Sequence, residues 1–372
     1  MEVAVWHRQE GPEVDVRGYR HSDDESIVEF LSSNMEWPAA CINGTKLDYW
    51  RWKFLSNPLG FHLLCVAEID GKIVSHCASI PVRMNVGGKE VLASQGVDLF
   101  THPAHRGHGL IGQVMECRNR IKEEHDIAFD FGFPNRAAYQ LSLTKHGFRD
   151  MGIDMMQYRY ITDQEQFFRK VRFGPLKKLG YTSLLKLRQS LAMGTDSGAD
   201  LTVGPEERFS DEATNIYLRE RERFDLISRR DADYLNWRYC DPRSGGFLRR
   251  AVREGTHFVG YAIYKIEERE GTRYLNIVDL LVEGGRTDAL ASLLMDSLEV
   301  SRQTHAETVL CCLPKYHPYG RSFQDLGFIA QLRMTGDMPM RMIWADRGLV
   351  ELDVLKRGSP RCHVTLGDTD WL

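Results

Sequence analysis

The chain has 372 residues, of which 42% are hydrophobic, 10% aromatic and 27% charged. This composition is typical of a globular protein and excludes disordered and collagen-like chains, and the length predicts about two domains. The 48 basic and 52 acidic residues give a formal net charge of -4. Nucleic-acid-binding proteins usually carry a basic excess, so we expect no nucleic-acid partner.

Targeting features are not apparent in the sequence. No apolar run approaches the roughly 20 residues that cross a bilayer, so we expect no membrane span. The first eight residues do not have the charged and apolar segments of a secretory signal. The eight cysteines form no Cys-x-x-Cys pair and most lie in apolar runs. Reduced, buried thiols and a cytoplasmic location are therefore the expectation.

The first 160 residues are predicted to alternate between strands and helices. A Ser22–Glu25 capping box predicts a helix that runs to about Ser33. Alternating apolar residues predict strands at 14–19, 63–70, 73–80, 84–92, 95–100 and 127–133, with a hairpin turn at Gly71. Helical spacing predicts further helices at 110–123 and 135–145.

A segment near residue 50 recurs near residue 235. Residues 48–54 (DYWRWKF) resemble residues 233–239 (DYLNWRY), and a proline follows each block. Residues 97–100 then match 278–281, 133–134 match 313–314, and 147–148 match 327–328. The order is kept while the offset falls only from 185 to 180. We therefore predict two units, 1–162 and 200–372, joined by a linker at 163–199 that contains a basic helix.

The segment from 101 to 112 joins a predicted strand to a predicted helix. Gly107 and Gly109 allow the backbone to turn its N–H groups outward, and the free amides and dipole of the next helix point the same way. This arrangement predicts an anion site suited to a pyrophosphate, to which Arg106 adds charge and His108 a donor. A tight turn entering a helix is the alternative. The segment matches neither the Walker pattern nor the dinucleotide-binding pattern.

The same segment resembles the signature of the GNAT (GCN5-related N-acetyltransferase) superfamily, Arg/Gln-x-x-Gly-x-Gly/Ala. Here Ile111 replaces the last small residue, and Gly112 follows it. Residues 133–139 and 145–148 resemble the strand–helix–strand end of that family. The resemblance covers most of 14–160 and, weakly, 200–340. It implies an α/β (α+β mixed sheet) fold of two tandem GNAT-like acyl-CoA N-acyltransferase domains, the second degenerate. The whole chain is similar to tandem acetyltransferases found near polysaccharide-biosynthesis functions.

The resemblance also implies the ligand and its place. Acetyl-CoA would be the co-substrate, with its pyrophosphate on the amides of 107–112 and its pantetheine arm added as a strand to the predicted strand at 95–100. The activity implied is transfer of an acetyl group to a primary amine of a small acceptor, such as an amino sugar, by direct attack. The implied cofactor-binding residues are Leu99, Phe100, Thr101, Arg106, Gly107, His108, Gly109, Leu110, Ile111, Gly112 and Asn135.

The reaction needs a base for the amine and an acid for the departing thiolate. Asp98 precedes the loop and is the first candidate base, and Asp130 is the second. For each of them a polar pair or a strand-end carboxylate is the alternative. Asp279 repeats Asp98 in a unit without the loop, which favours a structural role for Asp98 and Asp279. Leu143 occupies the position of the family's tyrosine, so Tyr139 is the candidate acid, with a packed helix tyrosine as the alternative.

Two further features allow alternatives. His102, His105 and His108 invite a metal interpretation, but no carboxylate or thiol completes a ligand set, so we expect no metal. Trp50, Trp52 and Trp237 are expected to be buried helix anchors rather than sugar-stacking residues.

The second unit is expected to bind no cofactor. In the second unit, Glu283 and Asp288 occupy the segment that corresponds to the loop at 106–112. Their negative charges would repel a pyrophosphate, which leaves one acetyl-CoA site. We expect residues 316–320 and 367–372 to be surface loops, with the lining of the acceptor cleft as the other interpretation.

Two other functions compete with this interpretation. A non-catalytic acyl-CoA-binding or assembly module would share the loop but turn nothing over. An aminoacyl-transferring relative that binds charged tRNA is disfavoured by the balanced charge. The expected state is a monomer or homodimer acting on a small-molecule amine.

Overall fold

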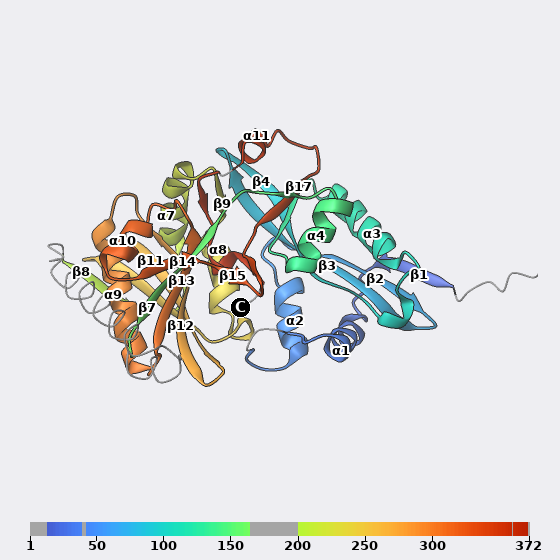
Figure 1. Cartoon of the computed structure of the whole chain (residues 1–372), viewed down its shortest axis with the longest axis horizontal. Helices are drawn as coiled ribbons and strands as arrows, with labels where there is room; N and C mark the ends of the chain where they lie inside the picture. Colours follow the sequence, from blue (N-terminus) through green and yellow to red (C-terminus); the bar gives the residue numbers. More distant parts are fainter. Residues whose placement is uncertain (1–12, 39–41, 164–199, 359, 371–372) are drawn as a thin grey trace, which may run out of the picture.

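The computed structural model describes residues 13–38, 42–163, 200–358 and 360–370. These residues form two mixed β-sheets with helices packed on them, which confirms the predicted α/β class. Figure 1 shows the two sheets side by side, with the C-terminal segment ending between them near α2 (Lys46–Leu55). The predicted linker helix and Cys41 lie outside the described residues.

The first half of the chain supplies most of one sheet. Its strand order is β1-β2-β3-β4-β5-β17-β6, and a short strand, β9, pairs with β3 and β18. The elements up to residue 163 are β1 (Val14–Gly18), α1 (Asp24–Asn34), α2, β2 (Leu63–Ile69), β3 (Lys72–Val86), β4 (Lys89–Thr101), η1 (Pro103–His105), α3 (Leu110–Glu124), β5 (Ile127–Gly132), α4 (Arg136–Lys145), β6 (Arg149–Asp150) and β7 (Met155–Ile161).

The second half supplies most of the other sheet, whose order is β14-β7-β13-β12-β11-β10-β8. Its strands are β8 (Leu201–Pro205), β9 (Leu226–Ser228), β10 (Phe247–Glu254), β11 (His257–Arg269), β12 (Thr272–Val282), β13 (Thr308–Pro314), β14 (Ile329–Leu332), β15 (Met334–Thr335), β16 (Met338–Pro339), β17 (Ile343–Asp346) and β18 (Cys362–His363). Its helical elements are α7 (Asp211–Glu220), η2 (Arg221–Arg223), α8 (Ala232–Leu235), η3 (Asn236–Cys240), η4 (Pro242–Ser244), α9 (Thr287–Gln303), α10 (Gly320–Asp325), α11 (Asp353–Lys356) and η5 (Leu366–Asp368).

The two halves exchange one strand each. β7 precedes residue 162 in the chain, but it lies in the second sheet between β13 and β14. β17 comes from the second half and lies in the first sheet between β5 and β6. Each sheet is therefore completed by a strand from the other half, so the hydrogen-bonded sheets cross the predicted division at 162. The division itself stays a prediction about the units of the chain.

Several local predictions were wrong. Residues 316–320 and 367–370 were expected to be surface loops, but His317, Tyr319, Asp368 and Thr369 are buried. The expected strand at 84–92 is instead the end of β3, a turn at Gly87 and Gly88, and the start of β4; both glycines have positive φ angles, which other residues rarely adopt. The capping box at Ser22 does not form. Asp23 occupies the N-cap position, and its carboxylate binds Arg17 at 2.6 Å instead of a helix amide. The helix itself and the hairpin at Gly71 are confirmed.

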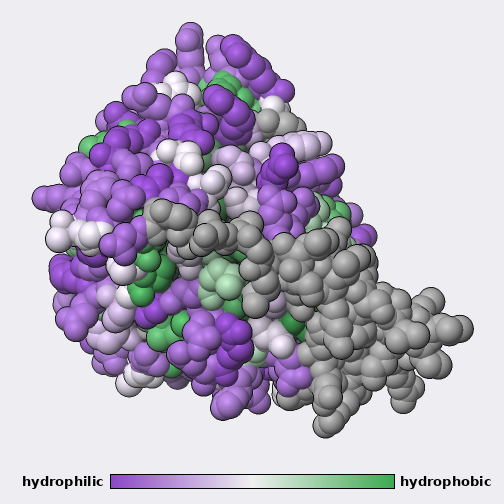
Figure 2. All heavy atoms as spheres, turned by 90° about the vertical axis from the view of Figure 1, so that its left-hand side faces the viewer, coloured by the Kyte–Doolittle hydropathy of each residue, from purple (hydrophilic) through white to green (hydrophobic). Residues whose placement is uncertain are grey.

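The largest apolar core lies between the two halves and includes residues of both sheets. Trp50 and Trp52 of α2 are fully buried in it, and Trp237 is 9% exposed, as expected of helix anchors. α3 packs on β1, β2 and β3 over a smaller core. The described atoms on the side shown in Figure 2 are mostly hydrophilic, with small hydrophobic areas between them. No helix among the described residues is long and apolar enough to span a membrane.

Candidate active site

β4 separates from β5 part of the way along its length. The parallel pairing of these strands ends at Gln95–Phe131, whereas the pairing of β4 with β3 continues to Thr101. The edge of β4 that faces β5 therefore has no strand partner from residue 96 onward in the described part of the chain. A strand edge of this kind can accept hydrogen bonds from an extended ligand. Leu99, on this segment, is 40% exposed.

The segment after β4 presents a row of free amides. Gly107 (φ 84°) and Gly109 (φ 76°) have left-handed backbone angles that glycine favours, and Gly109 caps α3. The first amide with a backbone acceptor is that of Gln113, which donates to the Gly109 carbonyl at 3.2 Å. Within the described residues, none of the six amides from 107 to 112 donates a hydrogen bond to the protein. They lie at the positive end of a 15-residue helix, as an anion site requires.

The side chains around this loop are held in place. The Arg106 Nε donates to the Thr101 carbonyl at 3.1 Å, and its guanidinium lies 5.4 Å from the centre of the Phe100 ring. The His108 Nδ1 is 3.4 Å from the His105 carbonyl oxygen. No group of three or more His, Cys, Asp or Glu side chains in the described residues is arranged to hold a metal.

Asp98 lies where β4 is irregular. Its φ angle is +48°, and the register between β3 and β4 shifts at this point. The His76 Nδ1 lies 2.7 Å from the Asp98 carbonyl oxygen; because a carbonyl only accepts, this nitrogen carries the proton. The carboxylate of Asp98 accepts a hydrogen bond from the Lys53 Nζ of α2 at 2.9 Å. Asp98 therefore faces α2, next to the point where β4 leaves β5.

A second carboxylate shares Lys53. Asp370, from the C-terminal segment, lies 3.9 Å from the Lys53 Nζ, and 21% of its side chain is exposed. Burial lowers the pKa of Lys53, but Asp98, Tyr49 and Asp370 together raise it above its ordinary value, so the ammonium stays charged. Burial raises the pKa of the Asp370 carboxyl above its ordinary value; Lys53 opposes this rise and Asp98 adds to it. A carboxylate with a raised pKa is a stronger base, and this one remains accessible.

Sequence reasoning missed Lys53, and it named Asp370 only within residues 367–372, which were expected to be a surface loop or to line the acceptor cleft. Lys53 lies in the repeated aromatic block, where its counterpart is Arg238, and its only signal is a cation on a helix whose other buried residues are aromatic. Asp370 is 272 positions after Asp98, and only the tertiary fold brings the two together.

Asp130, the second candidate base, is engaged in an ion pair. Its Oδ1 accepts from the Lys122 Nζ of α3 at 2.5 Å and from the Ser94 hydroxyl at 2.5 Å. Arg347 reaches its other oxygen at 3.4 Å. Although burial alone would raise the pKa of Asp130, these partners hold it below its usual value. The contacts favour the structural alternative for Asp130.

The two candidates on α4 also have intramolecular partners. Asn135 is the N-cap residue of α4, and its side-chain oxygen accepts from the Ala138 amide at 3.0 Å. The Tyr139 hydroxyl donates to Asp150 at 2.7 Å. This hydrogen bond raises the pKa of Tyr139, which therefore keeps its phenolic proton. Neither contact brings these side chains to Asp98.

The second sheet separates in the same way, but its opening is filled. The pairing of β12 with β13 ends at Ile277–Cys311, while β12 continues along β11 to Val282. η5 contacts both β12 and β13. The hydroxyl of Tyr319 accepts from the Val282 amide at 3.1 Å. Chain segments of the protein thus occupy the place that is free in the first sheet.

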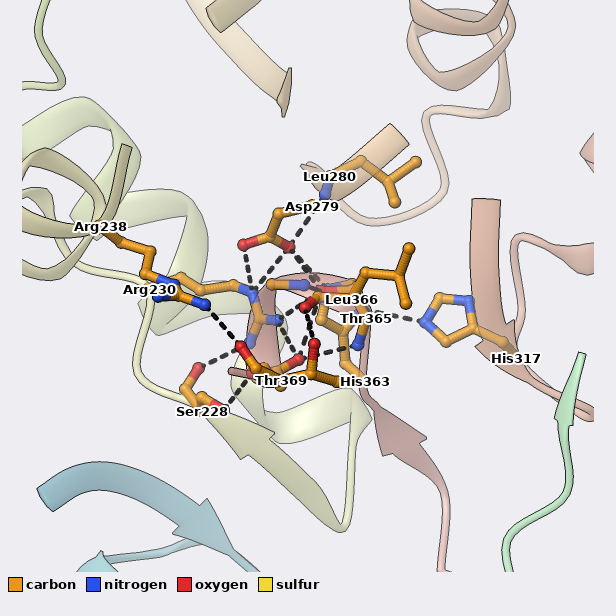
Figure 3. A network of polar contacts seen from close by, with 12 residues as sticks. Ser228, Arg230, Arg238, Asp279, Leu280, His317, His363, Thr365, Leu366 and Thr369 are labelled. Atoms are coloured by element: carbon orange, nitrogen blue, oxygen red, sulfur yellow. Dashed lines mark hydrogen bonds and ion pairs between the residues drawn. The ribbon is translucent and has the colours of Figure 1, made fainter. Parts of the chain in front are cut away.

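A buried polar network fixes this filling segment (Figure 3). Arg230 binds Asp279 at 3.1 Å and Asp368 at 2.7 Å, and all three side chains are almost completely buried. The Tyr239 hydroxyl donates to Asp279 at 3.1 Å. Asp279, the counterpart of Asp98, is thus fully paired in a buried cluster.

The loop of the second unit that corresponds to residues 107–112 is also occupied, by ion pairs within the protein. Arg286 pairs with Asp288 at 2.9 Å and with Glu254 at 3.2 Å, and Glu283 pairs with Arg219 at 3.2 Å. Acidic side chains and internal ion pairs at this position fit the expectation that it binds no pyrophosphate.

Comparisons with known proteins agree with this geometry. Residues 16–143 match a family model described as an acetyltransferase (GNAT) domain. No curated protein matches the chain.

Three solved structures are similar over most of the chain. A probable N-acyltransferase of unknown function from Enterococcus faecalis V583 is 13% identical, with a TM-score of 0.59 over 91% of this chain and 73% of that one. A GCN5-related N-acetyltransferase from Anabaena variabilis ATCC 29413 is 14% identical, with a TM-score of 0.60 over 89% and 72%. Saccharomyces cerevisiae N-myristoyltransferase with bound myristoyl-CoA is 12% identical, with a TM-score of 0.57 over 94% and 85%.

The fold is therefore that of the GNAT N-acyltransferases. Residues 16–143, which contain the separated strands and the amide loop, are the part of the chain that matches the GNAT acetyltransferase model.

Proposed function

We propose that this protein is an N-acyltransferase that moves an acetyl group from acetyl-CoA to a primary amine of a small acceptor, such as an amino sugar. The observation that carries the proposal is the row of six unpaired amides from 107 to 112 at the start of α3. Donors aimed together at solvent from a helix N-terminus suit a diphosphate. The match of residues 16–143 to a GNAT domain supports the same ligand.

The cofactor would run from this loop along the free edge of β4. Its diphosphate would accept hydrogen bonds from the amides between Gly107 and Gly112, with Arg106 adding positive charge. The pantetheine arm would pair with Leu99, Phe100 and Thr101, because this edge of β4 has no partner among the described residues. The thioester would then lie near Asp98, where β4 and β5 part.

The chemistry would be direct attack of the amine nitrogen on the thioester carbon. An alkyl amine with a pKa of about 10.4 is mostly protonated at pH 7, and removing this proton costs about 4.6 kcal/mol. We assign this proton to the carboxylate pair of Asp98 and Asp370, with Asp370 as the stronger base because Lys53 is bound directly to Asp98. The new C–N bond forms, the C–S bond breaks, and the CoA thiolate takes a proton. Tyr139 is the proposed donor, since it keeps its proton.

We further propose that the chain consists of two tandem GNAT-like units, 1–162 and 200–372, joined by a linker at 163–199. The exchange of β7 and β17 supports this proposal, because each strand plays the same part in the sheet of the other unit. The second unit would be silent as an acyl-CoA site, since η5 and Tyr319 occupy its opening.

The test is calorimetric titration of the full chain with CoA and acetyl-CoA. Gly109→Glu should weaken binding at least tenfold, because it places a carboxylate in the anion site. Gly285→Glu is the matched control: Gly285 is an exposed glycine with a positive φ angle in the equivalent loop of the second unit. Equal binding by the wild type and Gly109→Glu would contradict the proposal.

The competing function, a non-catalytic acyl-CoA-binding module, is separated by turnover. Release of free CoA thiol from acetyl-CoA in the presence of a panel of primary amines, including an amino sugar, supports the enzyme. Tight binding of CoA without thiol release for any amine supports the module.

A further inference from the structure

We propose that Gly96 and Gly132 form the seat of the acyl group, and that the aromatic side chains of Phe131 and Phe133 beside this seat restrict the acyl group to short chains. The proposal rests on the proposed function, because it concerns the acyl-CoA that the loop from 107 to 112 would bind. The two glycines are the first residues beyond the last hydrogen-bonded pair of β4 and β5, Gln95–Phe131. They therefore flank the point where the two strands part.

The position of these glycines follows from the direction of the cofactor. A ligand anchored at the start of α3 and extended along β4 runs from Thr101 back toward Gln95, so its reactive end reaches the point where the strands part. Asp98, which binds Lys53 of α2, lies on β4 two residues from Gly96, between that point and Thr101. A group attached to the sulfur of CoA then extends past Asp98 toward Gly96 and Gly132.

Space is open at this place because neither residue has a side chain. A Cβ atom added to Gly96 would meet no other atom within 4 Å, and one added to Gly132 would meet only the Gly96 carbonyl oxygen, at 3.9 Å. Neither glycine has a positive φ angle, so the backbone does not require glycine here. The missing side chains are explained by a group that must fit between the strands.

The space does not continue deep into the protein on the side of the main core. The cavity lined by Gln95 and Phe131, together with Ile80 and Trp237, has a volume of about 10 Å³. This is room for about one water molecule. Phe131 is 1% exposed and Phe133 is 7% exposed, so aromatic rings already pack this side. An acyl chain of many carbons would have to displace them, whereas an acetyl group would not.

The second unit provides an internal comparison. The last pair of β12 and β13 is Ile277–Cys311, so the first residues beyond it are Val278 and Cys312. Their side chains are 0% and 1% exposed, and both belong to the largest apolar core. In the second unit, where the loop at 283–288 is ion-paired, side chains fill the point at which the strands part. In the first unit, where the amides of 107–112 are free, two glycines leave this point open.

The test measures binding of CoA, acetyl-CoA, butyryl-CoA and decanoyl-CoA to the full chain, so it does not depend on knowing the acceptor. The wild type should bind acetyl-CoA and CoA with similar affinity, and decanoyl-CoA at least tenfold more weakly than acetyl-CoA. Gly96→Val should bind CoA as the wild type does but acetyl-CoA at least tenfold more weakly. Gly132→Ala, a smaller change, should weaken butyryl-CoA more than acetyl-CoA.

Gly204→Val is the matched control, since Gly204 is a strand glycine with the same open surroundings and no positive φ angle, on β8 of the other sheet. It should leave all four affinities unchanged, and thermal melting checks that each variant folds. Decanoyl-CoA binding as tightly as acetyl-CoA, or Gly96→Val affecting CoA and acetyl-CoA equally, would overturn the inference alone. Failure of unmodified CoA to bind the wild type would overturn the proposed function, and this inference with it.

Discussion

Trp52 and Trp237 exchange hydrogen bonds. The Trp52 Nε1 donates to the Trp237 carbonyl at 2.8 Å, and the Trp237 Nε1 donates to the Trp52 carbonyl at 3.1 Å. The two rings stack with their centres 5.5 Å apart. The residues occupy the same place in the two repeated blocks of the sequence. A reciprocal contact of this kind is what a two-fold axis imposes on two like units, so it supports the proposed duplication.

Replacing either tryptophan should lower the free energy of unfolding by more than the loss of buried ring area alone explains. Trp52→Phe and Trp237→Phe each leave a buried carbonyl without its donor, which costs about 1–3 kcal/mol. The matched control is Trp50→Phe, because the Trp50 Nε1 is buried without a partner in the described part of the protein. Urea unfolding checks the order, and equal losses for all three variants would contradict the assigned hydrogen bonds.

Asp130 should act through stability rather than through catalysis. Its pKa is lowered in the folded protein, so its ion pair stabilises the fold above the ordinary carboxyl pKa and is lost as the pH falls through the lowered value. The difference in unfolding free energy between the wild type and Asp130→Asn should be constant from about pH 5 to 8 and shrink below about pH 4. Urea unfolding over this pH range checks the prediction. A difference that persists unchanged at pH 3 would argue against a charged Asp130 in the folded state.

Asp370 should control the rate of acetyl transfer and leave the affinity for CoA unchanged. If it takes the proton of the amine, Asp370→Asn should lower kcat about 10²–10⁴-fold and remove the low-pH limb of the rate profile. The rate of the wild type should fall as the pH falls through the raised pKa of Asp370, because the protonated carboxyl is no base. Asp337→Asn, on an exposed residue paired with Arg136, is the control. A wild-type rate in Asp370→Asn would remove this residue from the mechanism.

The buried network around Arg230 should be needed to hold the C-terminal segment. Arg230→Met leaves Asp279 and Asp368 buried with one partner fewer, a loss that costs about 3–5 kcal/mol in buried pairs. Because Asp370 lies only two residues after Asp368, kcat should also fall while CoA affinity stays unchanged. Stability and CoA titrations on the same preparation check this, and loss of CoA affinity in a folded variant would contradict it.

The sequence was sufficient for features that depend on neighbouring residues. The amide loop, α3 and the hairpin at Gly71 follow from local patterns, and their bounds agree with the structure within a few residues. The turn at Gly87 and Gly88 was missed, because the prediction extended one strand across this pair of glycines. The capping box at Ser22 does not form because the helix begins one residue later, with Asp23 at the N-cap position and its carboxylate bound to Arg17.

The remaining features depend on contacts between distant segments. The exchange of β7 and β17 leaves no trace in the local sequence pattern, because the side chains of a strand alternate in the same way whichever sheet the strand joins. Lys53 and Asp370 acquire their roles only when α2 and the C-terminal segment meet at Asp98. Periodicity and motif spacing contain no signal for such a meeting.

The most direct test of the central claim is a crystal structure of the protein with bound acetyl-CoA. We expect the diphosphate oxygens to lie about 2.7–3.2 Å from amide nitrogens between Gly107 and Gly112, with the pantetheine arm along β4. A diphosphate bound elsewhere, or these amides paired with carbonyls of the protein itself in the complex, would contradict it.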